Sequence, residues 1–252
     1  MKKTLTTLIL TGSLISSQAA ISLVSSDDNS QGNTLLYGST FFSTVAVQAG
    51  DVLVLSHATN KRDNGSNTIS AVVAGETFTS LAAGNSGGQA GAYVFYSTIS
   101  TTGSINISFD TTNASKNGSK TNAYYLLRAG AGETISLADS KTAADVAGTS
   151  LSLSLDSSAV GGFGVLAAAT QTTAMTGLPT GFTEDRSDSG DKRITWSNSS
   201  VAAGHLNPTV TIDTADFEAA VGAVFVATVV PEPSSTALLG LGSLALLLRR
   251  RK

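Results

Sequence analysis

The chain has 252 residues, enough for one or two globular domains, and it contains no cysteine. The missing thiols exclude disulfides, thiolate metal sites, iron–sulfur clusters and cysteine nucleophiles. Residues 20–230 hold 9 of the 15 Lys and Arg residues and 17 of the 18 Asp and Glu residues, a net charge of −8. Such an acidic surface argues against nucleic acid or anionic lipid as a partner.

The N-terminus has the three parts of a secretory signal peptide. Lys2 and Lys3 form a positive segment, residues 5–15 are mostly apolar, and Ser17 and Ala19 place small residues at the −3 and −1 positions. We therefore expect residues 1–19 to be removed by signal peptidase, with cleavage between Ala19 and Ala20 or close to it.

Residues 20–38 follow, and they are polar enough to form a loose arm or one edge strand. Residues 39–229 are expected to form the folded body. A division near residues 139–148 would give two small domains instead of one. We favour one domain, because this segment has no proline and is too short and mixed to be a clear linker.

The body has the pattern of an all-β protein. Polar and apolar residues alternate at 105–109, 151–155 and 210–213, which predicts half-buried strands. Continuous apolar runs at 52–55, 163–169 and 219–229 predict central strands covered on both faces. Clusters of Gly, Asn, Ser and Asp separate about 11 to 13 short strands. This pattern favours an antiparallel two-sheet sandwich, either jelly-roll or immunoglobulin-like.

No group of residues in the body indicates catalysis. The pattern G-x-S-x-G occurs at residues 84–88, but a nucleophile elbow needs a following helix, and the sequence there predicts a hairpin loop. His57 and His205 are the only histidines and have no paired carboxylates nearby, so we expect structural or solvent-facing roles. We predict no catalytic residue and no cofactor.

One dense acidic loop, residues 184–191, contains Asp185, Asp188 and Asp191. Calcium prefers such oxygen ligands, but the spacing is not that of an EF-hand, and Arg186, Lys192 and Arg193 offset the charge. The sequence predicts a solvated hairpin tip that binds calcium weakly at most. We therefore predict no metal site, with Asp185, Asp188 and Asp191 as weak candidates.

Trp196 is the only tryptophan. Together with Tyr93 and Tyr96 it could stack on sugar rings if these side chains are exposed. A packing role for Trp196 in a half-buried strand is an equally natural interpretation.

The C-terminus has three parts in a fixed order. Pro231, Glu232 and Pro233 break regular structure, residues 237–248 are uncharged and apolar, and four cations, Arg249, Arg250, Arg251 and Lys252, end the chain. A stable span normally takes about 20 apolar residues, so this shorter run suits a transient transmembrane helix. The four cations would remain on the cytoplasmic side of the membrane.

This tail resembles the PEP-CTERM sorting domain over about residues 230–252. The resemblance implies export in a Gram-negative bacterium, transient anchoring in the inner membrane, and cleavage near Pro231–Glu232–Pro233 by the membrane protease exosortase. It also implies delivery to the cell surface or to the exopolysaccharide matrix of a biofilm, and nothing about the rest of the chain.

We therefore expect a non-enzymatic exported protein of the cell surface or extracellular matrix. The alternative is a carbohydrate-binding, lectin-like module that acts on exopolysaccharide.

Overall fold

A computed structural model describes residues 20–31, 44–59, 69–73, 75–84, 90–111, 120–157, 161–177, 179–188 and 190–230. Within these ranges every regular element is a β-strand, and no helix occurs. All strand pairs are antiparallel. The prediction of an all-β, antiparallel body is confirmed.

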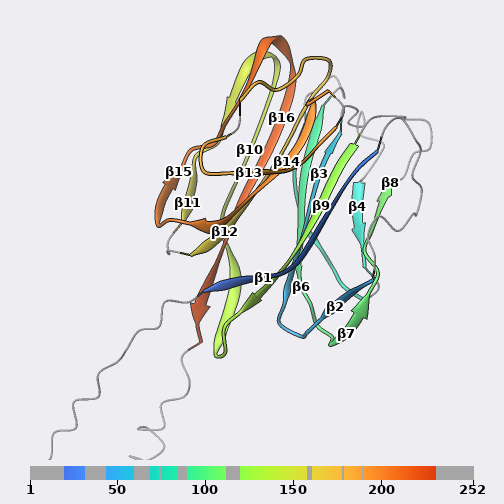
Figure 1. The fold of residues 1–252 in the computed structure, drawn as a ribbon, viewed down its shortest axis with the longest axis vertical. Helices are drawn as coiled ribbons and strands as arrows, with labels where there is room; N and C mark the ends of the chain where they lie inside the picture. The colour runs from blue at the N-terminus through green and yellow to red at the C-terminus, as the bar shows by residue number, and fades with distance from the viewer. Residues whose placement is uncertain are drawn as a thin grey trace, which may run out of the picture.

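Two five-stranded sheets form most of the molecule (Figure 1). The first sheet has the order β1 (Ile21–Gln31), β9 (Lys120–Ala129), β3 (Val52–Thr59), β6 (Gly91–Thr98), β5 (Thr79–Gly84). The second has the order β10 (Glu133–Ser152), β16 (Thr209–Val229), β12 (Gly162–Thr170), β14 (Arg193–Val201), β13 (Thr183–Ser187).

Three two-stranded sheets complete the described elements. They pair β2 (Val45–Val47) with β7 (Gly103–Ile105), β4 (Ile69–Val72) with β8 (Ser108–Thr111), and β11 (Leu155–Ser157) with β15 (Gly204–Leu206).

The two large sheets pack face to face around one apolar core. Alternate residues of β3, β6 and β9 meet alternate residues of β12 and β16 in a single buried cluster. Two aromatic pairs join the sheets: Tyr125 with Phe163, at 5.3 Å between ring centroids, and Tyr96 edge-on to Phe225, at 5.5 Å. Each such pair contributes about 0.5–1.5 kcal/mol beyond its buried area.

The outer faces of both sheets carry apolar clusters of their own. On the first sheet, Leu53 and Leu55 pack with residues of β2, including Val45. On the second, Leu166 packs with Trp196 and with residues such as Met175 that lie outside the large sheets. All eight residues of β3 and all nine of β12 are therefore buried, as their continuous apolar runs predict.

Two of the three alternating segments have the predicted faces, whereas residues 105–109 are divided between β7, which ends at Ile105, and β8, which begins at Ser108. Leu151, Leu153 and Leu155 are buried, whereas Ser152 and Ser154 between them are exposed. Val210 and Ile212 are buried as well. The hydrophobic effect thus fixes the register of these segments, since a shift of one residue would expose every leucine.

One boundary prediction needs correction. Residues 21–31 are not a loose arm but the edge strand that was the other interpretation: as β1 they pair with β9 from Ile21 opposite Ala129 to Gln31 opposite Lys120. Residues 139–148, where a division into two domains was considered and not favoured, lie inside β10 and pair with β16. The chain halves on either side of residues 130–132 each build one large sheet, and the two sheets share the core.

Candidate functional site

The first and last strands of the folded body both have an end beside the same turn, the β9–β10 turn at residues 129–133. Ile21, the first residue of β1, lies opposite Ala129, and Val229, the last residue of β16, lies opposite Glu133. The backbone nitrogen of Val230 donates a hydrogen bond to the carbonyl of Gly132 at 2.8 Å. The segments next to the two expected processing sites therefore start from the same place on the fold.

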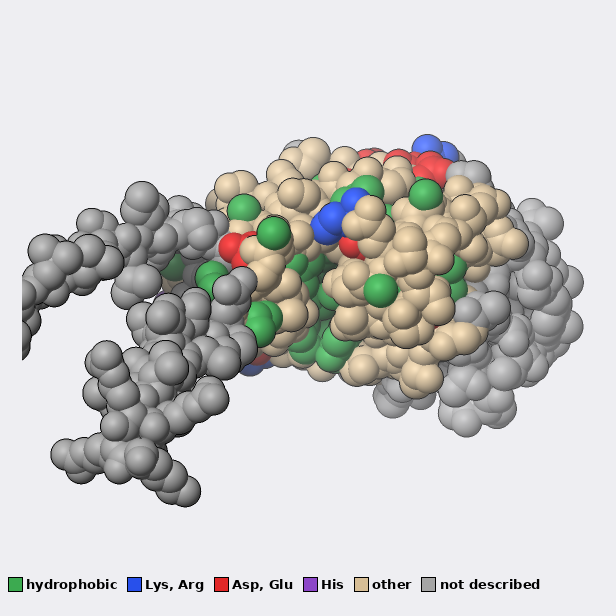
Figure 2. Space-filling model, turned by 90° about the horizontal axis from the view of Figure 1, so that it is seen from below, with side chains coloured by type: hydrophobic (Ala, Val, Ile, Leu, Met, Phe, Trp, Pro, Cys, Tyr) green, Lys and Arg blue, Asp and Glu red, His purple; other side chains and the backbone are tan. Residues whose placement is uncertain are grey.

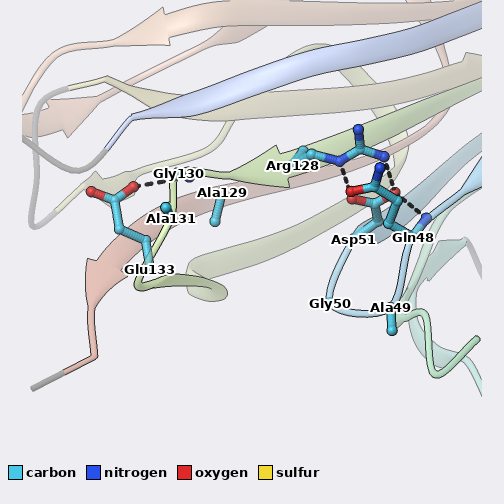
Figure 3. A pocket seen from close by; sticks show the side chains of 9 residues that line it. All are labelled: Gln48, Ala49, Gly50, Asp51, Arg128, Ala129, Gly130, Ala131 and Glu133. Carbon is cyan, nitrogen blue, oxygen red and sulfur yellow. Dashed lines mark hydrogen bonds and ion pairs between the residues drawn. The ribbon is translucent and has the colours of Figure 1, made fainter. Parts of the chain in front are cut away.

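The turn has its own hydrogen bonds, which the local sequence makes possible (Figure 3). Gly132 has a φ of +75°, a left-handed conformation that favours glycine. The Glu133 backbone nitrogen donates to the Gly130 carbonyl, and the Gly130 nitrogen donates to the Glu133 carboxylate, both at 3.1 Å. These bonds hold the Glu133 side chain back against its own turn.

A pocket of about 340 Å³ lies beside this turn, between residues 48–51 and 128–133. Arg128 donates from Nε and Nη2 to the two carboxylate oxygens of Asp51, each at 2.7 Å. Asp51 is buried and also accepts the Gln48 backbone N–H at 2.8 Å. Viewed from this end, the surface is hollowed, with apolar side chains inside the hollow (Figure 2).

Arg128 and Asp51 neutralise each other, so this pair does not indicate chemistry. A bidentate Arg–carboxylate pair is a strong and specific structural contact. Here it joins the turn at residues 48–51 to β9. Asp51 was not singled out by sequence reasoning, because no local pattern links it to an arginine 77 residues away.

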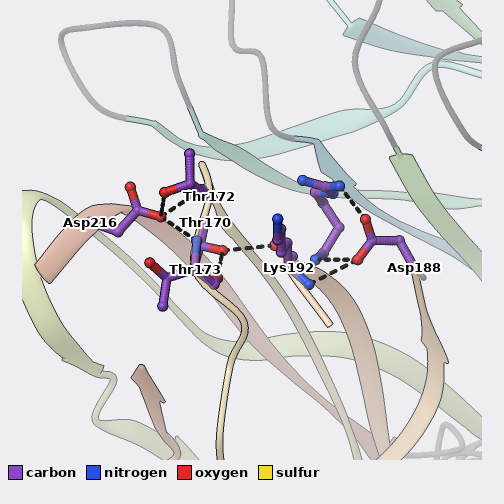
Figure 4. Close-up of polar contacts among 7 residues, drawn as sticks. Thr170, Thr172, Thr173, Asp188, Lys192 and Asp216 are labelled. Carbon is purple, nitrogen blue, oxygen red and sulfur yellow. Dashed lines mark hydrogen bonds and ion pairs between the residues drawn. The ribbon is translucent and has the colours of Figure 1, made fainter. Parts of the chain in front are cut away.

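The acidic segment does not form a metal site in the described structure. Glu184 to Ser187 belong to strand β13, so only the residues after them form the hairpin tip. Asp185 accepts hydrogen bonds from the hydroxyls of Tyr125, at 2.6 Å, and Ser197, at 2.8 Å. Asp188 is buried and bonds instead to Arg193 and to the Lys192 backbone nitrogen (Figure 4).

Asp185, Asp188 and Asp191 therefore have separate environments, and Asp191 is exposed with a φ of +48°. Within the described ranges no three His, Cys, Asp or Glu residues are close enough to hold a metal ion. The prediction of a wholly solvated loop is wrong for Asp188. Burial lowers the pKa of its partner Arg193, while the charge of Asp188 acts in the opposite direction.

The residues suggested for sugar stacking are largely inside the protein. Trp196 is 0% exposed and Tyr93 is 7% exposed, and each lies in an apolar cluster on the outer face of a large sheet. Tyr96 is half-buried and packs against Phe225. Since stacking on a sugar ring needs an exposed aromatic face, the prediction is wrong for Trp196 and Tyr93, and the other layers of the protein cover them.

The two histidines occupy different environments. His57 is buried, its Nδ1 lies 2.5 Å from Asn122 Oδ1, and burial lowers its pKa to about 4. His205 is exposed and pairs with Asp156 across the β11–β15 sheet. The predicted structural and solvent-facing roles fit these positions.

The G-x-S-x-G segment begins at the end of β5, where Gly84 lies opposite Gly91 of β6. The next element is a strand of the same hairpin, which confirms the predicted hairpin connection. Residues 85–89 themselves lie outside the described residues.

The fold gives Glu218 two acidic neighbours, Asp145 and Asp216. Glu218 is 1% exposed, and neither of its carboxylate oxygens has a hydrogen-bond partner. Burial, and then the charges of Asp145 and Asp216, raise its pKa to about 7. No sequence signal could have revealed this group, because Asp145 reaches it through the pairing of β10 with β16.

Residues 229–252 match the sequence profile of the PEP-CTERM protein-sorting motif. The chain therefore ends in a PEP-CTERM sorting motif, which marks it as an exported substrate of exosortase. No curated protein and no solved structure matches the chain.

The match begins at the last residue of β16 and covers Pro231, Glu232, Pro233 and the four terminal cations. These residues, the apolar run 237–248 and Ala19 lie outside the described residues, whereas Ala20 is described and exposed. None of the described elements is a helix of the length and hydropathy that a membrane span requires.

Proposed function

We propose that this chain is a non-enzymatic protein that is exported, held briefly in the inner membrane by its C-terminal tail, and then released by exosortase. Its destination would be the cell surface or the extracellular matrix of a Gram-negative bacterium, where exopolysaccharide and other biofilm components surround it. The folded part delivered there is an antiparallel two-sheet sandwich. Residues 1–19 act as the signal peptide, and residues 237–248 form the short transmembrane helix.

One observation carries this proposal: the sorting motif starts where the hydrogen-bonded body ends. Val229 closes the pairing of β16 with β10, and Val230 makes one further bond to Gly132. The motif begins at residue 229. All strands of the two large sheets lie within residues 21–229. Cleavage near Pro231 would therefore leave both large sheets intact.

The carbohydrate-binding alternative loses its main support, because Trp196 and Tyr93 are buried. Contact with exopolysaccharide would then depend on other surface residues, and no described group of side chains favours it. We retain the matrix as a destination and propose no sugar site.

The experiment is a processing assay in a Gram-negative host that contains an exosortase. One variant replaces Pro231, Glu232 and Pro233 with alanine, and a second variant ends at Val230. The matched control replaces the next three residues, Ser234, Ser235 and Thr236, with alanine, so that the same number of alanines is introduced without touching the motif.

The parent and the control should be shortened and leave the membrane fraction, as followed by intact mass and cell fractionation. The first variant should remain full-length in the membrane, because its anchor is present without the recognition motif. The truncated protein should be β-rich, melt cooperatively and never be retained in the membrane. If the Pro-Glu-Pro variant is processed like the parent, the tail is a plain membrane anchor and the proposal fails.

A further inference from the structure

A carboxylate of the β9–β10 turn lies next to the expected start of the exported chain. The Ala20 backbone nitrogen donates to Glu133 Oε2 at 3.3 Å. In the precursor this nitrogen is a neutral peptide N–H. Hydrolysis of the bond between Ala19 and Ala20 adds water across it, so that Ala19 leaves with a carboxylate and Ala20 keeps an α-amino group, which is mostly protonated at neutral pH.

We propose that Glu133 is the binding site for the α-ammonium group that signal-peptide removal creates at Ala20. This inference rests on cleavage before Ala20, which is part of the proposed function. It goes beyond that function because it assigns a role to the new terminus itself.

The carboxylate is held in position independently of the N-terminus. Glu133 Oε2 also accepts the Gly130 N–H at 3.1 Å. A Cβ atom at position 130 would lie 2.7 Å from the same oxygen, so a side chain there would displace the carboxylate from this position. Because the carboxylate is already held in place, little conformational entropy is lost when the ammonium binds.

The Glu133 carboxylate has no ion-pair partner among its described charged neighbours, so it can accept the α-ammonium group. Arg128, on the strand that enters the turn, is engaged by Asp51 in two hydrogen bonds. The ion pairs among the described residues do not include Glu133. An α-ammonium at Ala20 would therefore provide the cation that this acid lacks, at a distance already within hydrogen-bonding range.

The pair would fasten the edge strand β1 to the turn from which the sorting tail leaves. Ile21 begins the pairing with β9, and without a contact at Ala20 the first residues of an edge strand fray readily. Removal of the signal peptide would change a neutral hydrogen bond into a charge-assisted one, which is roughly twice as strong. Val230 is bonded to the same turn through Gly132, so the two processed ends share one point of attachment.

The test measures the chemical reactivity of the new α-amino group. The full-length chain is exported with its own signal peptide and purified, and the mass of the N-terminal peptide identifies the first residue. The α-amino group is then acetylated at pH 7 and low ionic strength, and initial rates are compared for the parent, Glu133→Gln and Glu76→Gln. Glu76 is the matched control, because its carboxylate accepts the Ser100 backbone N–H in another part of the fold.

Only the neutral amine reacts, so an ion pair that stabilises the ammonium slows the reaction. Glu133→Gln should react about two to five times faster than the parent, the range expected for an exposed ion pair. Glu76→Gln should react at the parent rate. In the parent, about 1 M salt should remove most of the protection, because the screening length falls to about 3 Å.

Equal rates for the parent and Glu133→Gln overturn the inference while leaving the sorting proposal intact. A first residue other than Ala20 also overturns it, and the measured mass shows that the cleavage site is then the cause. If Glu133→Gln does not accumulate, the salt dependence of the parent decides, and a rate independent of salt overturns the inference.

Discussion

Two buried acids of the second sheet have opposite surroundings. At the β13–β14 turn, Asp188 is bonded to the Arg193 guanidinium and to the Lys192 backbone nitrogen (Figure 4). In strand β16, Glu218 has no hydrogen-bond partner and has Asp145 and Asp216 as its charged neighbours. Asp188 is 8% exposed and Glu218 is 1% exposed. They therefore differ in their partners and not in their burial.

The comparison shows that a charge is tolerated inside this protein only when its neighbours suit its ionisation state. Asp188 has the Arg193 guanidinium and a backbone N–H in place of its lost hydration. Among the described residues, Glu218 has no cation or hydrogen-bond donor to replace its lost hydration. Its carboxylate is therefore destabilised and binds a proton more readily, which is the reason for its raised pKa. The three predictions below test this difference, from the largest expected effect to the smallest.

Removal of the partner from the satisfied acid should have the largest effect. Arg193→Leu leaves Asp188 buried without its cation, and we expect the free energy of unfolding to fall by about 3 kcal/mol. Urea denaturation at pH 7 measures the change. Lys141→Leu is the control, because that lysine is 47% exposed in its pair with Asp139 and should contribute less than about 1 kcal/mol. Equal losses in the two variants would contradict the comparison.

Neutralisation of the unsatisfied acid should stabilise the protein. Because the pKa of Glu218 rises from 4.5 to about 7 on folding, its ionisation opposes folding. The penalty is absent below about pH 4.5, grows as the pH rises towards 7, and is complete above that. Glu218→Gln should therefore raise the free energy of unfolding by about 2 kcal/mol at pH 8.

At pH 4 the same variant should have nearly the stability of the parent, since Glu218 is then protonated in both the folded and unfolded states. Urea denaturation at the two pH values provides the measurement. Glu184→Gln, at an exposed position of β13, is the matched control. A gain of the same size at both pH values would show that shape, and not ionisation, separates glutamine from glutamate at this site.

Asp216 is an intermediate case, and its variant should have the smallest effect. Burial raises its pKa, but hydrogen bonds from the Thr172, Thr173 and Phe217 backbone nitrogens outweigh burial and lower it. Asp216→Asn should cost about 1 kcal/mol at pH 7. This cost should disappear as the pH falls well below 3.8, because the parent then loses the same charge. Thermal unfolding at pH 7 and pH 2 would detect it, and a cost that persists at pH 2 would contradict the assignment.

The sequence determined the elements whose signal is local. The leucines of residues 151–155 are buried and the serines exposed across the junction of β10 and β11, because successive side chains of extended backbone point in opposite directions. The apolar run at 163–169 became a strand buried on both faces, and the order of charge, proline and apolar residues in the tail identified the sorting motif. Each of these signals lies within a few consecutive residues.

The tertiary structure decided which distant residues meet. Trp196 and Ile194 alternate with polar neighbours and share one face of β14, but only the packing of other segments shows that this face is covered. Glu218 meets Asp145, and Glu133 meets Ala20, through strand pairings that span 73 and 113 residues of sequence. Burial and charge pairing are properties of these contacts. Residues that are isolated in the sequence therefore became the most informative groups of the folded protein.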